Sequence, residues 1–319
     1  MRLRTERQTF ISHVRIYPHG QRLDVCVELD SAYPWHGILH VFSCTLENAA
    51  SFPVDILPGK HEIWFRGLTI KPEAQKWDIE EGNLHVLTVS GPGLETCSTS
   101  FGLRNFSVEN GYLTMNGRRI FLRSETNCAV FPETGYPPMD VDAWKEILLK
   151  YRAYGVNCMR FHSHCPPEAA FAAADELGML MQPELSHWDP EHAFASEESQ
   201  RYYETELWAI LRHLANHPSF VMLTFGNELH ADAAGHAFMD SLLRKARDYD
   251  PTRLYANGSN VHYGAIGADP ASDFYTAMMY YDQDMRATCD GPKGWLNQEY
   301  PNARHNYQST VRADRKSVV

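Results

Sequence analysis

One short block of the sequence places an acid and an amide directly after an apolar run. Residues 220–225 read Phe-Val-Met-Leu-Thr-Phe and are followed by Gly226, Asn227 and Glu228. Such a run is typical of a strand buried on both faces, so the Asn-Glu pair is predicted at a strand exit. A carboxylic acid held there suits general acid catalysis, and glycoside cleavage needs an acid that protonates the leaving oxygen. The alternative is that Glu228 is simply an acid near a helix N-terminus, where the helix dipole favours it.

The elements around this block alternate between predicted strands and predicted helices. Strands are expected at 119–123, 156–161, 179–184, 220–225 and 254–257, with a possible sixth at 272–279. Helices are expected at 142–154, 168–177, 202–215 and 236–249. This alternation predicts a parallel sheet covered by helices, either an open doubly wound sheet or a closed (β/α)8 barrel.

Polar residues at the carboxyl ends of the strands favour the barrel. These residues are Glu125, Arg160, His162, Glu184, Asn227 and Glu228. A (β/α)8 barrel has its active site at this end, and no G-x-G-x-x-G follows the first strand to support a dinucleotide site. A barrel needs about 250 residues, and only roughly 200 follow residue 119. We therefore predict an α/β chain with an incomplete barrel at 116–319, truncated at its C-terminal end.

The first part of the chain has a different pattern. Residues 1–115 contain short alternating apolar runs at 11–16, 23–29, 38–44, 61–65 and 84–89, separated by turn clusters. This spacing predicts an immunoglobulin-like β-sandwich. A strand at 101–108 and a tight turn at Asn116-Gly117 are expected to lead into the barrel.

The composition excludes several classes of protein. The net charge of -11, from 40 acidic and 29 basic residues, disfavours a nucleic-acid surface. No stretch approaches 18 consecutive apolar residues, so no membrane span is expected. The seven cysteines include no C-x-x-C pair, so we expect free thiols and no zinc or redox centre.

Several sequence blocks, taken together and in order, resemble glycoside hydrolase family 2, the family of β-galactosidases, β-glucuronidases and β-mannosidases. The blocks are Phe101-Gly102-Leu103-Arg104, Asn116-Gly117, Pro132-Glu133-Thr134-Gly135, Gly155-Val156-Asn157-Cys158-Met159-Arg160, Asp175-Glu176-Leu177-Gly178, and Asn216-His217-Pro218-Ser219 with Gly226-Asn227-Glu228. The resemblance implies a retaining β-glycosidase without a metal or other cofactor, whose partner is a carbohydrate substrate. It assigns Glu228 as general acid/base and Asn227 to the substrate.

The resemblance also implies a second carboxylate, the nucleophile, on the seventh strand. Glu299, in Asn297-Gln298-Glu299-Tyr300-Pro301, is similar to the Glu-Tyr motif of the family. However, no apolar strand precedes it, and Pro301 stands where the family often has glycine. We expect the nucleophile to be absent and the chain to be a fragment of a longer enzyme, with little or no activity alone.

Other site candidates each have two interpretations. Arg160 precedes the segment that aligns with the Ser-His-Tyr-Pro motif of the family, where Ser163 falls on the histidine. A slip of one residue places His162 or His164 there, so either could line the sugar site or be a structural histidine. Glu184 could face the site or be a buried counter-ion for Arg160. Trp188 could be a sugar-stacking platform or part of the core.

The chain departs from the family after the first strand. The usual Lys-Gly-x-Asn-x-His-Glu reads Arg-Ser-Glu-Thr-Asn-Cys-Ala at 123–129. This argues against β-galactosidase or β-glucuronidase specificity and makes Glu125 and Asn127 candidate substitute contacts. Two other functions stay open: a non-catalytic carbohydrate-binding protein on a degenerate barrel, and a barrel glycosidase of another family with the same Asn-Glu site.

Overall fold

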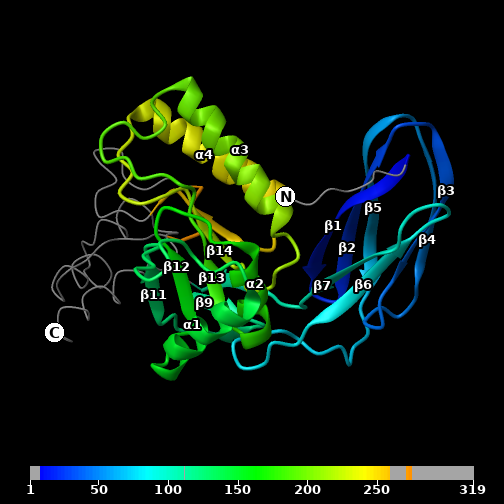
Figure 1. Cartoon of the computed structure of the whole chain (residues 1–319), viewed down its shortest axis with the longest axis horizontal. Coiled ribbons are helices and arrows are strands. Elements are labelled where there is room, and N and C mark those ends of the chain that lie inside the picture. The colour runs from blue at the N-terminus through cyan, green and yellow to red at the C-terminus, as the bar shows by residue number, and fades with distance from the viewer. Residues whose placement is uncertain (1–7, 111, 259–270, 275–319) are drawn as a thin grey trace. The chain divides into compact units, whose positions relative to one another are not determined.

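The computed structural model describes residues 8–110, 112–258 and 271–274 (Figure 1). The chain divides into two compact units. The N-terminal unit comprises Met1–Trp77, Gly82–Asn105 and the short segment Ala215–Pro218. The α/β unit comprises Asp78–Glu81, Phe106–Leu214 and Ser219–Val319. Each is described by itself.

Two antiparallel sheets form the described part of the N-terminal unit. One has the order β1-β2-β5, with β1 at Thr9–His19, β2 at Arg22–Ser31 and β5 at Gly59–Thr69. The other has the order β4-β3-β6-β7, with β3 at Trp35–Phe42, β4 at Ala50–Ile56, β6 at His85–Ser90 and β7 at Cys97–Phe101. The predicted strands at 11–16, 23–29, 38–44, 61–65 and 84–89 are confirmed, within one to four residues at their ends.

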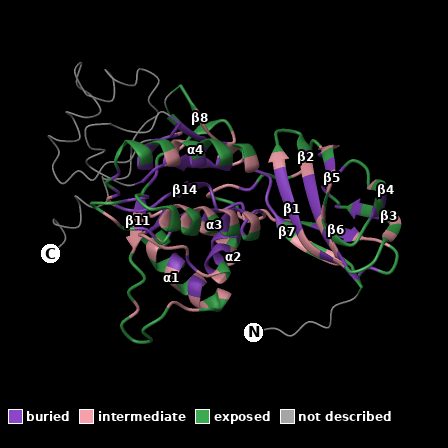
Figure 2. Cartoon of the chain, turned by 90° about the horizontal axis from the view of Figure 1, so that it is seen from above, coloured by how far each residue is buried: buried purple, intermediate pink, exposed green. Residues whose placement is uncertain are grey.

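Alternation along these strands builds one shared core. Val25, Val27 and Leu29 of β2 are fully buried, and they share a hydrophobic cluster with Val41 of β3 and Leu87 of β6. Because successive side chains of a strand point to opposite faces, the intervening residues lie on the other face of the sheet. Figure 2 shows β1 and β2 largely buried.

The predicted strand at 101–108 is wrong, because the chain leaves the ladder in its middle. β7 ends at Phe101, and β8 begins only at Phe106 (Phe106–Glu109). Between them, the Leu103 carbonyl accepts a hydrogen bond from the Trp77 amide at 2.8 Å, and the Arg104 Nε donates to the Pro218 carbonyl at 2.8 Å. The Leu103 carbonyl is therefore satisfied outside the strand ladder, and the Arg104 side chain holds the segment to Pro218.

The tight turn at Asn116-Gly117 is confirmed. It joins β9 (Tyr112–Met115) to β10 (Arg118–Arg119) in the antiparallel sheet β10-β9-β8. Asn116 has φ 53° and Gly117 has φ 77°. Asparagine and glycine are the residues that a hairpin turn with two positive φ angles prefers.

Parallel strands alternate with helices in the rest of the α/β unit (Figure 1). The strands are β11 (Ser124–Asn127), β12 (Cys158–Phe161), β13 (Leu180–Gln182), β14 (Met222–Thr224) and β15 (Leu254–Ala256). The helices between them are α1 (Val141–Ala153), α2 (Glu168–Leu177), α3 (Glu197–His213) and α4 (Ala233–Tyr249).

These strands follow one another in chain order without a reversal in the described residues. β11, β12 and β13 pair in that order, as do β14 and β15. Parallel bridges from Met181 to Phe220 and from Glu184 to Thr224 join the two groups. A doubly wound sheet reverses its order at a switch point, so the observed order favours the barrel arrangement over it. The α/β class predicted from the sequence is confirmed.

The helix starts follow capping residues. Asp140, Ser196 and Asp232 each accept a hydrogen bond from a backbone amide three residues later, as N-caps do. The cap at Ser196 begins α3 at Glu197, five residues earlier than the apolar pattern predicted. Helix α2 ends, as predicted, before Gly178, which has φ 71°.

The predicted first strand at 119–123 is wrong in position. Arg118 and Arg119 belong to the antiparallel hairpin, and the parallel strand begins at Ser124. Asn157 holds the connection: its Nδ2 donates to the Phe121 carbonyl at 3.0 Å, and its Oδ1 accepts from the Arg123 amide at 2.8 Å. No strand is present at 272–274, and the rest of the predicted sixth strand lies outside the described residues.

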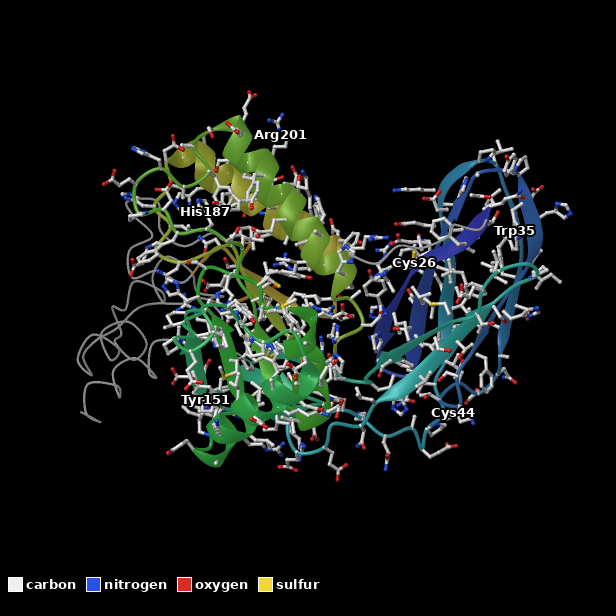
Figure 3. All side chains as sticks on the ribbon, viewed as in Figure 1. Cys26, Trp35, Cys44, Tyr151, His187 and Arg201 are labelled. Carbon is white, nitrogen blue, oxygen red and sulfur yellow. The ribbon has the colours of Figure 1, made fainter. Side chains whose placement is uncertain are left out.

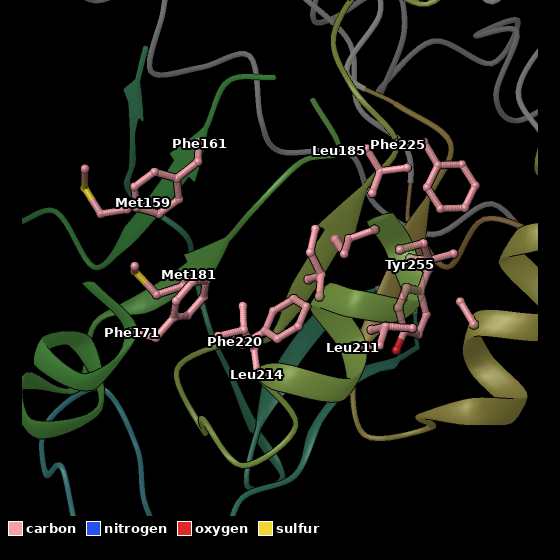
Figure 4. Close-up of a cluster of buried hydrophobic side chains, with 14 of the residues drawn as sticks. Met159, Phe161, Phe171, Met181, Leu185, Leu211, Leu214, Phe220, Phe225 and Tyr255 are labelled. Carbon is pink, nitrogen blue, oxygen red and sulfur yellow. The ribbon is translucent and has the colours of Figure 1, made fainter. Parts of the chain in front are cut away.

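Side chains from strands and helices meet in the core of the α/β unit (Figure 4). Met159 of β12 and Met181 of β13 are fully buried, as are Phe171 of α2, Leu211 of α3 and Tyr255 of β15. The apolar faces of the helices therefore cover the strands, and the strand ends are left for polar residues. Among the described helices, none has the length and apolar character needed to cross a membrane.

Candidate active site

The carboxyl ends of β12, β13 and β14 bring four of the predicted residues together. Arg160 lies on β12, Glu184 follows β13, and Asn227 and Glu228 follow β14. The parallel bridges Glu184–Thr224 and Trp188–Asn227 extend the pairing of β13 and β14 beyond the regular strands. Side chains at neighbouring strand ends therefore lie side by side.

A buried ion pair forms the base of the site. The Arg160 Nε lies 2.7 Å from the Glu184 Oε1, and both side chains are buried. Glu184 also accepts hydrogen bonds from the Ser163 backbone N–H at 2.8 Å and from the Thr224 hydroxyl at 3.0 Å. Buried charges need such partners, because their desolvation is otherwise uncompensated.

The environment keeps Glu184 ionised. Burial alone would raise the pKa of this carboxyl. The charge and hydrogen bond of Arg160, the Ser163 N–H and the charge of His162 act in the opposite direction and together lower the pKa of Glu184 below its ordinary value. A lowered pKa favours the anion, which pairs with Arg160, and this suits a structural counter-ion better than a proton donor.

Arg160 in turn orients Asn227. Its second terminal nitrogen donates to the Asn227 Oδ1 at 2.7 Å. A guanidinium only donates hydrogen bonds, so the amide oxygen must face it and the amide nitrogen must point away. Asn227 is fully buried, and its Nδ2 has no hydrogen-bond partner among the described residues. The amide therefore presents an unsatisfied N–H donor directly beside Glu228.

Glu228 is half-buried and is held by a neighbouring tryptophan. Its Oε2 accepts a hydrogen bond from the Trp188 indole Nε1 at 3.0 Å. Glu228 has φ 50°, in the left-handed region that glutamate rarely adopts. Such backbone conformations concentrate at functional sites, where the surrounding structure holds them.

The loop after β13 packs tightly against the loop after β14. The His187 carbonyl accepts a hydrogen bond from the Asn227 amide at 3.0 Å. Gly226 has φ 142°, and a Cβ added to it would lie 2.2 Å from the His187 carbonyl oxygen. Only glycine allows this approach, so the loop carrying His187 and Trp188 sets where Asn227 and Glu228 lie.

His187 is anchored from behind by aromatic rings. Its ring stacks on Tyr203 of α3 with centroids 3.9 Å apart, and Phe194 meets it edge-on at 4.6 Å. Figure 3 labels His187 in this region. Burial, opposed only in part by the charge of Asp189, lowers the pKa of His187 to about 4. The imidazole is therefore neutral at physiological pH.

Comparison with known proteins shows which enzymes the chain is similar to. No family model matches the chain. Over 257 residues, or 72% of the chain, it is 25% identical to the β-galactosidase BgaC of Bifidobacterium adolescentis and covers 24% of that protein. It is 27% identical over 183 residues, or 56% of the chain, to a β-galactosidase of Thermoanaerobacterium thermosulfurigenes, of which it also covers 24%. The chain thus spans about a quarter of the length of these curated relatives.

Solved structures share its fold. A GH2 β-galacturonidase from Eisenbergiella tayi bound to galacturonate matches 94% of the chain with a TM-score of 0.77 and 16% identity, over 56% of its own length. A β-glucuronidase of Parabacteroides merdae matches 94% of the chain with a TM-score of 0.71 and 19% identity, over 39% of its own length. The chain is thus similar in sequence to β-galactosidases and similar in fold to enzymes of glycoside hydrolase family 2.

The other predicted site residues lie near the same strand ends. The His162 ring meets the Trp188 ring edge-on, with centroids 5.2 Å apart. The His164 Nδ1 lies 3.0 Å from the His162 carbonyl, and its ring packs against Phe161. The His164 carbonyl accepts a hydrogen bond from the Glu184 amide at 3.2 Å. Glu125 lies on β11 opposite Met159. Asn127 accepts a hydrogen bond from the Ala129 amide at 2.9 Å, which shapes the loop after β11.

Two residues of this candidate site were not assigned a role from the sequence. Ser163 holds Glu184 through its backbone N–H and has φ 55°, and Thr224 holds Glu184 through its hydroxyl. The only signal for Thr224 was a single polar residue inside an apolar run. The Ser163 hydrogen bond comes from its backbone N–H and depends on the local backbone conformation, so the residue type does not predict it.

Neither a metal site nor the second carboxylate emerges from the described residues. Within residues 8–110, 112–258 and 271–274, no three His, Cys, Asp or Glu side chains gather as metal ligands would. Glu299, the candidate nucleophile, lies outside the described residues. The described residues thus bring an ion pair, an amide and a carboxyl group together at the ends of β12, β13 and β14.

Proposed function

We propose that this chain carries the acid/base side of a retaining β-glycosidase site, built on a (β/α)8 barrel that follows an immunoglobulin-like β-sandwich. Glu228 protonates the leaving oxygen of a β-glycoside and later takes a proton from the attacking water. The second carboxylate forms the glycosyl-enzyme intermediate, as retaining enzymes require. Substrates would be β-hexosides, the class named in the β-galactosidases, β-glucuronidase and β-galacturonidase to which the chain is similar.

One observation carries the proposal: an unsatisfied amide donor stands beside a carboxyl group at one strand end. Arg160 turns the Asn227 Oδ1 toward itself, so the buried Nδ2 points away without a partner among the described residues. Leaving a buried donor unsatisfied costs about 1–3 kcal/mol. A sugar hydroxyl would satisfy it, and a hydrogen bond to the 2-OH strengthens in the transition state of glycoside cleavage.

Glu184 and Arg160 support this role without taking part in proton transfer. Their ion pair is buried, and Glu184 stays ionised, so the pair fixes the Asn227 amide through Arg160. The proton donor is then the half-exposed carboxyl of Glu228, which a substrate can reach. Two carboxyl groups in different environments, one buried and paired and one accessible, divide structural and catalytic work.

The test is chemical rescue of Glu228→Ala. Aryl β-galactosides, β-glucuronides, β-galacturonides and β-mannosides with a dinitrophenyl leaving group are assayed with this chain and with any longer natural chain that contains it. Without its acid/base, a retaining enzyme still forms the intermediate from activated substrates but hydrolyses it slowly. Added azide should restore turnover and yield a β-glycosyl azide with retained configuration.

The control is Glu191→Ala, since Glu191 is an exposed acid on the loop between β13 and α3. It should keep wild-type rates and show no azide product. Full activity of Glu228→Ala on a phenyl glycoside, whose leaving group needs protonation, would remove Glu228 from the mechanism. Sugar binding without turnover in both chains would instead assign a carbohydrate-binding function.

A further inference from the structure

We propose that Trp188 is a positioning residue that fixes the carboxyl group of Glu228 and selects which of its oxygens carries the acid proton. This inference rests on the proposed function of Glu228. It starts from the 3.0 Å hydrogen bond from the Trp188 Nε1 to the Glu228 Oε2. The sequence offered two other roles for Trp188, a sugar-stacking platform and a core residue.

Burial excludes the core role. Trp188 is 60% exposed, whereas Trp144 of the same unit is fully buried. A platform used only for stacking would leave its N–H to solvent. Here the N–H is directed at the carboxyl group that the mechanism needs.

Both ends of the hydrogen bond are fixed by the backbone. Trp188 and Asn227 form a parallel bridge, and the Asn227 amide donates to the His187 carbonyl at 3.0 Å. Trp188 and Glu228 are therefore attached to two paired segments. The ring of Trp188 is further supported by His162, which meets it edge-on at 5.2 Å with an interplanar angle of 82°.

The direction of the hydrogen bond has a chemical consequence. An indole nitrogen only donates, so the Glu228 oxygen that faces it must be an acceptor. When Glu228 is protonated, Oε2 then acts as the carbonyl oxygen and the proton resides on Oε1. In the first step this Oε1 proton passes to the glycosidic oxygen as the C–O bond breaks, leaving a carboxylate. In the second step the same oxygen takes a proton from water.

Trp188→Phe removes the N–H and keeps an aromatic ring at the position. Trp208→Phe is the matched control, because Trp208 lies on α3 and packs on Tyr249 instead. The rate constant kcat/KM, which reports cleavage of the glycosidic bond, is compared for phenyl and dinitrophenyl glycosides. Trp188→Phe should lower kcat/KM about tenfold for the phenyl glycoside, as expected for one lost hydrogen bond to a charged group. The dinitrophenyl glycoside needs no protonation and should be affected about twofold at most.

A second measurement does not depend on activity. Selective ¹⁵N labelling of tryptophan gives indole N–H signals from the seven tryptophans, and Trp188→Phe identifies the signal of Trp188. Glu228→Ala should displace this signal more than that of Trp208. If neither this chain nor a longer natural chain that contains it turns over either glycoside, the proposed function fails, and the indole signal alone then decides whether Trp188 holds Glu228.

Three results would overturn the proposal. An equal rise in KM for both glycosides with unchanged kcat would make Trp188 a stacking platform. Unchanged kinetics of Trp188→Phe on the phenyl glycoside would remove its role. An indole signal of Trp188 that ignores Glu228→Ala would show that the hydrogen bond does not form.

Discussion

Glu228 adopts a backbone conformation that costs free energy for any residue with a Cβ. Its φ of 50° places it in the left-handed region, and it follows Gly226, whose φ is 142°. The hydrogen bond from Trp188 and the paired loop hold it there. The orientation of the Glu228 carboxyl group therefore costs folding free energy, as is common at functional sites.

This strain predicts an unusual order of two variants. Glu228→Gly should be more stable than Glu228→Ala by about 1 kcal/mol, because glycine adopts positive φ without a Cβ clash. Urea denaturation of both variants measures the difference. At Arg201, an exposed residue inside α3, the order should reverse, and alanine should be more stable than glycine by about 1 kcal/mol. If alanine were more stable than glycine at both positions, the backbone of Glu228 would not be strained.

His187 predicts how stability changes in mild acid. Its pKa is about 4 in the folded chain, below the ordinary value of 6.5. Above pH 6.5 the ring is neutral in both the folded and the unfolded chain, so its titration does not change the free energy of unfolding there. Between pH 6.5 and about 4 the unfolded chain binds a proton that the folded chain does not, so stability falls as the pH falls.

His187→Phe isolates this contribution, because phenylalanine keeps an aromatic ring against Tyr203 but cannot titrate. Urea midpoints at pH 7.5 and 5.0 should differ less in the variant than in wild type. Glu184, whose pKa is also lowered, loses its contribution only in stronger acid and remains in both proteins. Equal acid sensitivity of the two proteins would show that His187 is not buried as a neutral ring.

At the scale of elements, the site depends on how closely two loops approach. The loops after β13 and β14 meet at Gly226 and His187, and this approach brings Trp188 beside Glu228. Beneath them, the Arg160–Glu184 ion pair ties β12 to β13, and Thr224 ties β14 to the same carboxylate. These contacts therefore hold the ends of β12, β13 and β14 together beneath the two loops.

Gly226→Ala tests the loop approach. A Cβ at Gly226 would lie 2.2 Å from the His187 carbonyl oxygen, so one loop must move. We expect a loss of about 3 kcal/mol or more in the free energy of unfolding. Gly135→Ala is the control, since Gly135 has φ 75° but open space around its Cβ position, and it should lose only about 1 kcal/mol. Similar losses in both would mean that only φ matters.

At the scale of the whole molecule, each of the two units is built from several segments of the chain, and these segments alternate along the sequence. The segment Ala215–Pro218 belongs to the N-terminal unit although it lies between α3 and β14 in sequence. Within that unit, Asn216 Oδ1 accepts from the Ile16 amide at 2.9 Å, and its Nδ2 donates to the Val14 carbonyl at 2.7 Å. The side chain thus pairs with the open edge of β1 as a neighbouring strand would.

Asn216→Ala should lower the stability of the N-terminal unit by about 2 kcal/mol, because two backbone groups of β1 lose their partners. Amide hydrogen exchange at Ile16 and urea denaturation measure the effect. Asn83→Ala, which removes an exposed hydrogen bond to the Lys76 carbonyl, is the control and should cost less than about 0.5 kcal/mol. Unchanged exchange at Ile16 would exclude the pairing role of Asn216.

The sequence by itself determined the alternation of strands and helices, the all-β start of the chain and the Asn-Glu pair at the exit of a buried strand. These follow from local rules: apolar period, capping residues and turn chemistry act over a few residues. The helix at Glu168–Leu177 and the turn at Asn116-Gly117 were therefore predicted closely. The break at residues 102–105 and the start of β11 at Ser124 were not, because their hydrogen bonds go to Trp77, Pro218 and Asn157, far away in sequence.

Only the tertiary structure decided how the site is assembled. From the sequence, Arg160, Glu184, Asn227 and Trp188 were separate candidates. Glu184 and Trp188 each had two interpretations, and the role of Asn227 was inferred from the family resemblance. Packing of three parallel strand ends turned Glu184 into the counter-ion of Arg160 and directed the indole of Trp188 to Glu228. Distances of this kind depend on where strands end relative to one another, and residue types do not encode that relation locally.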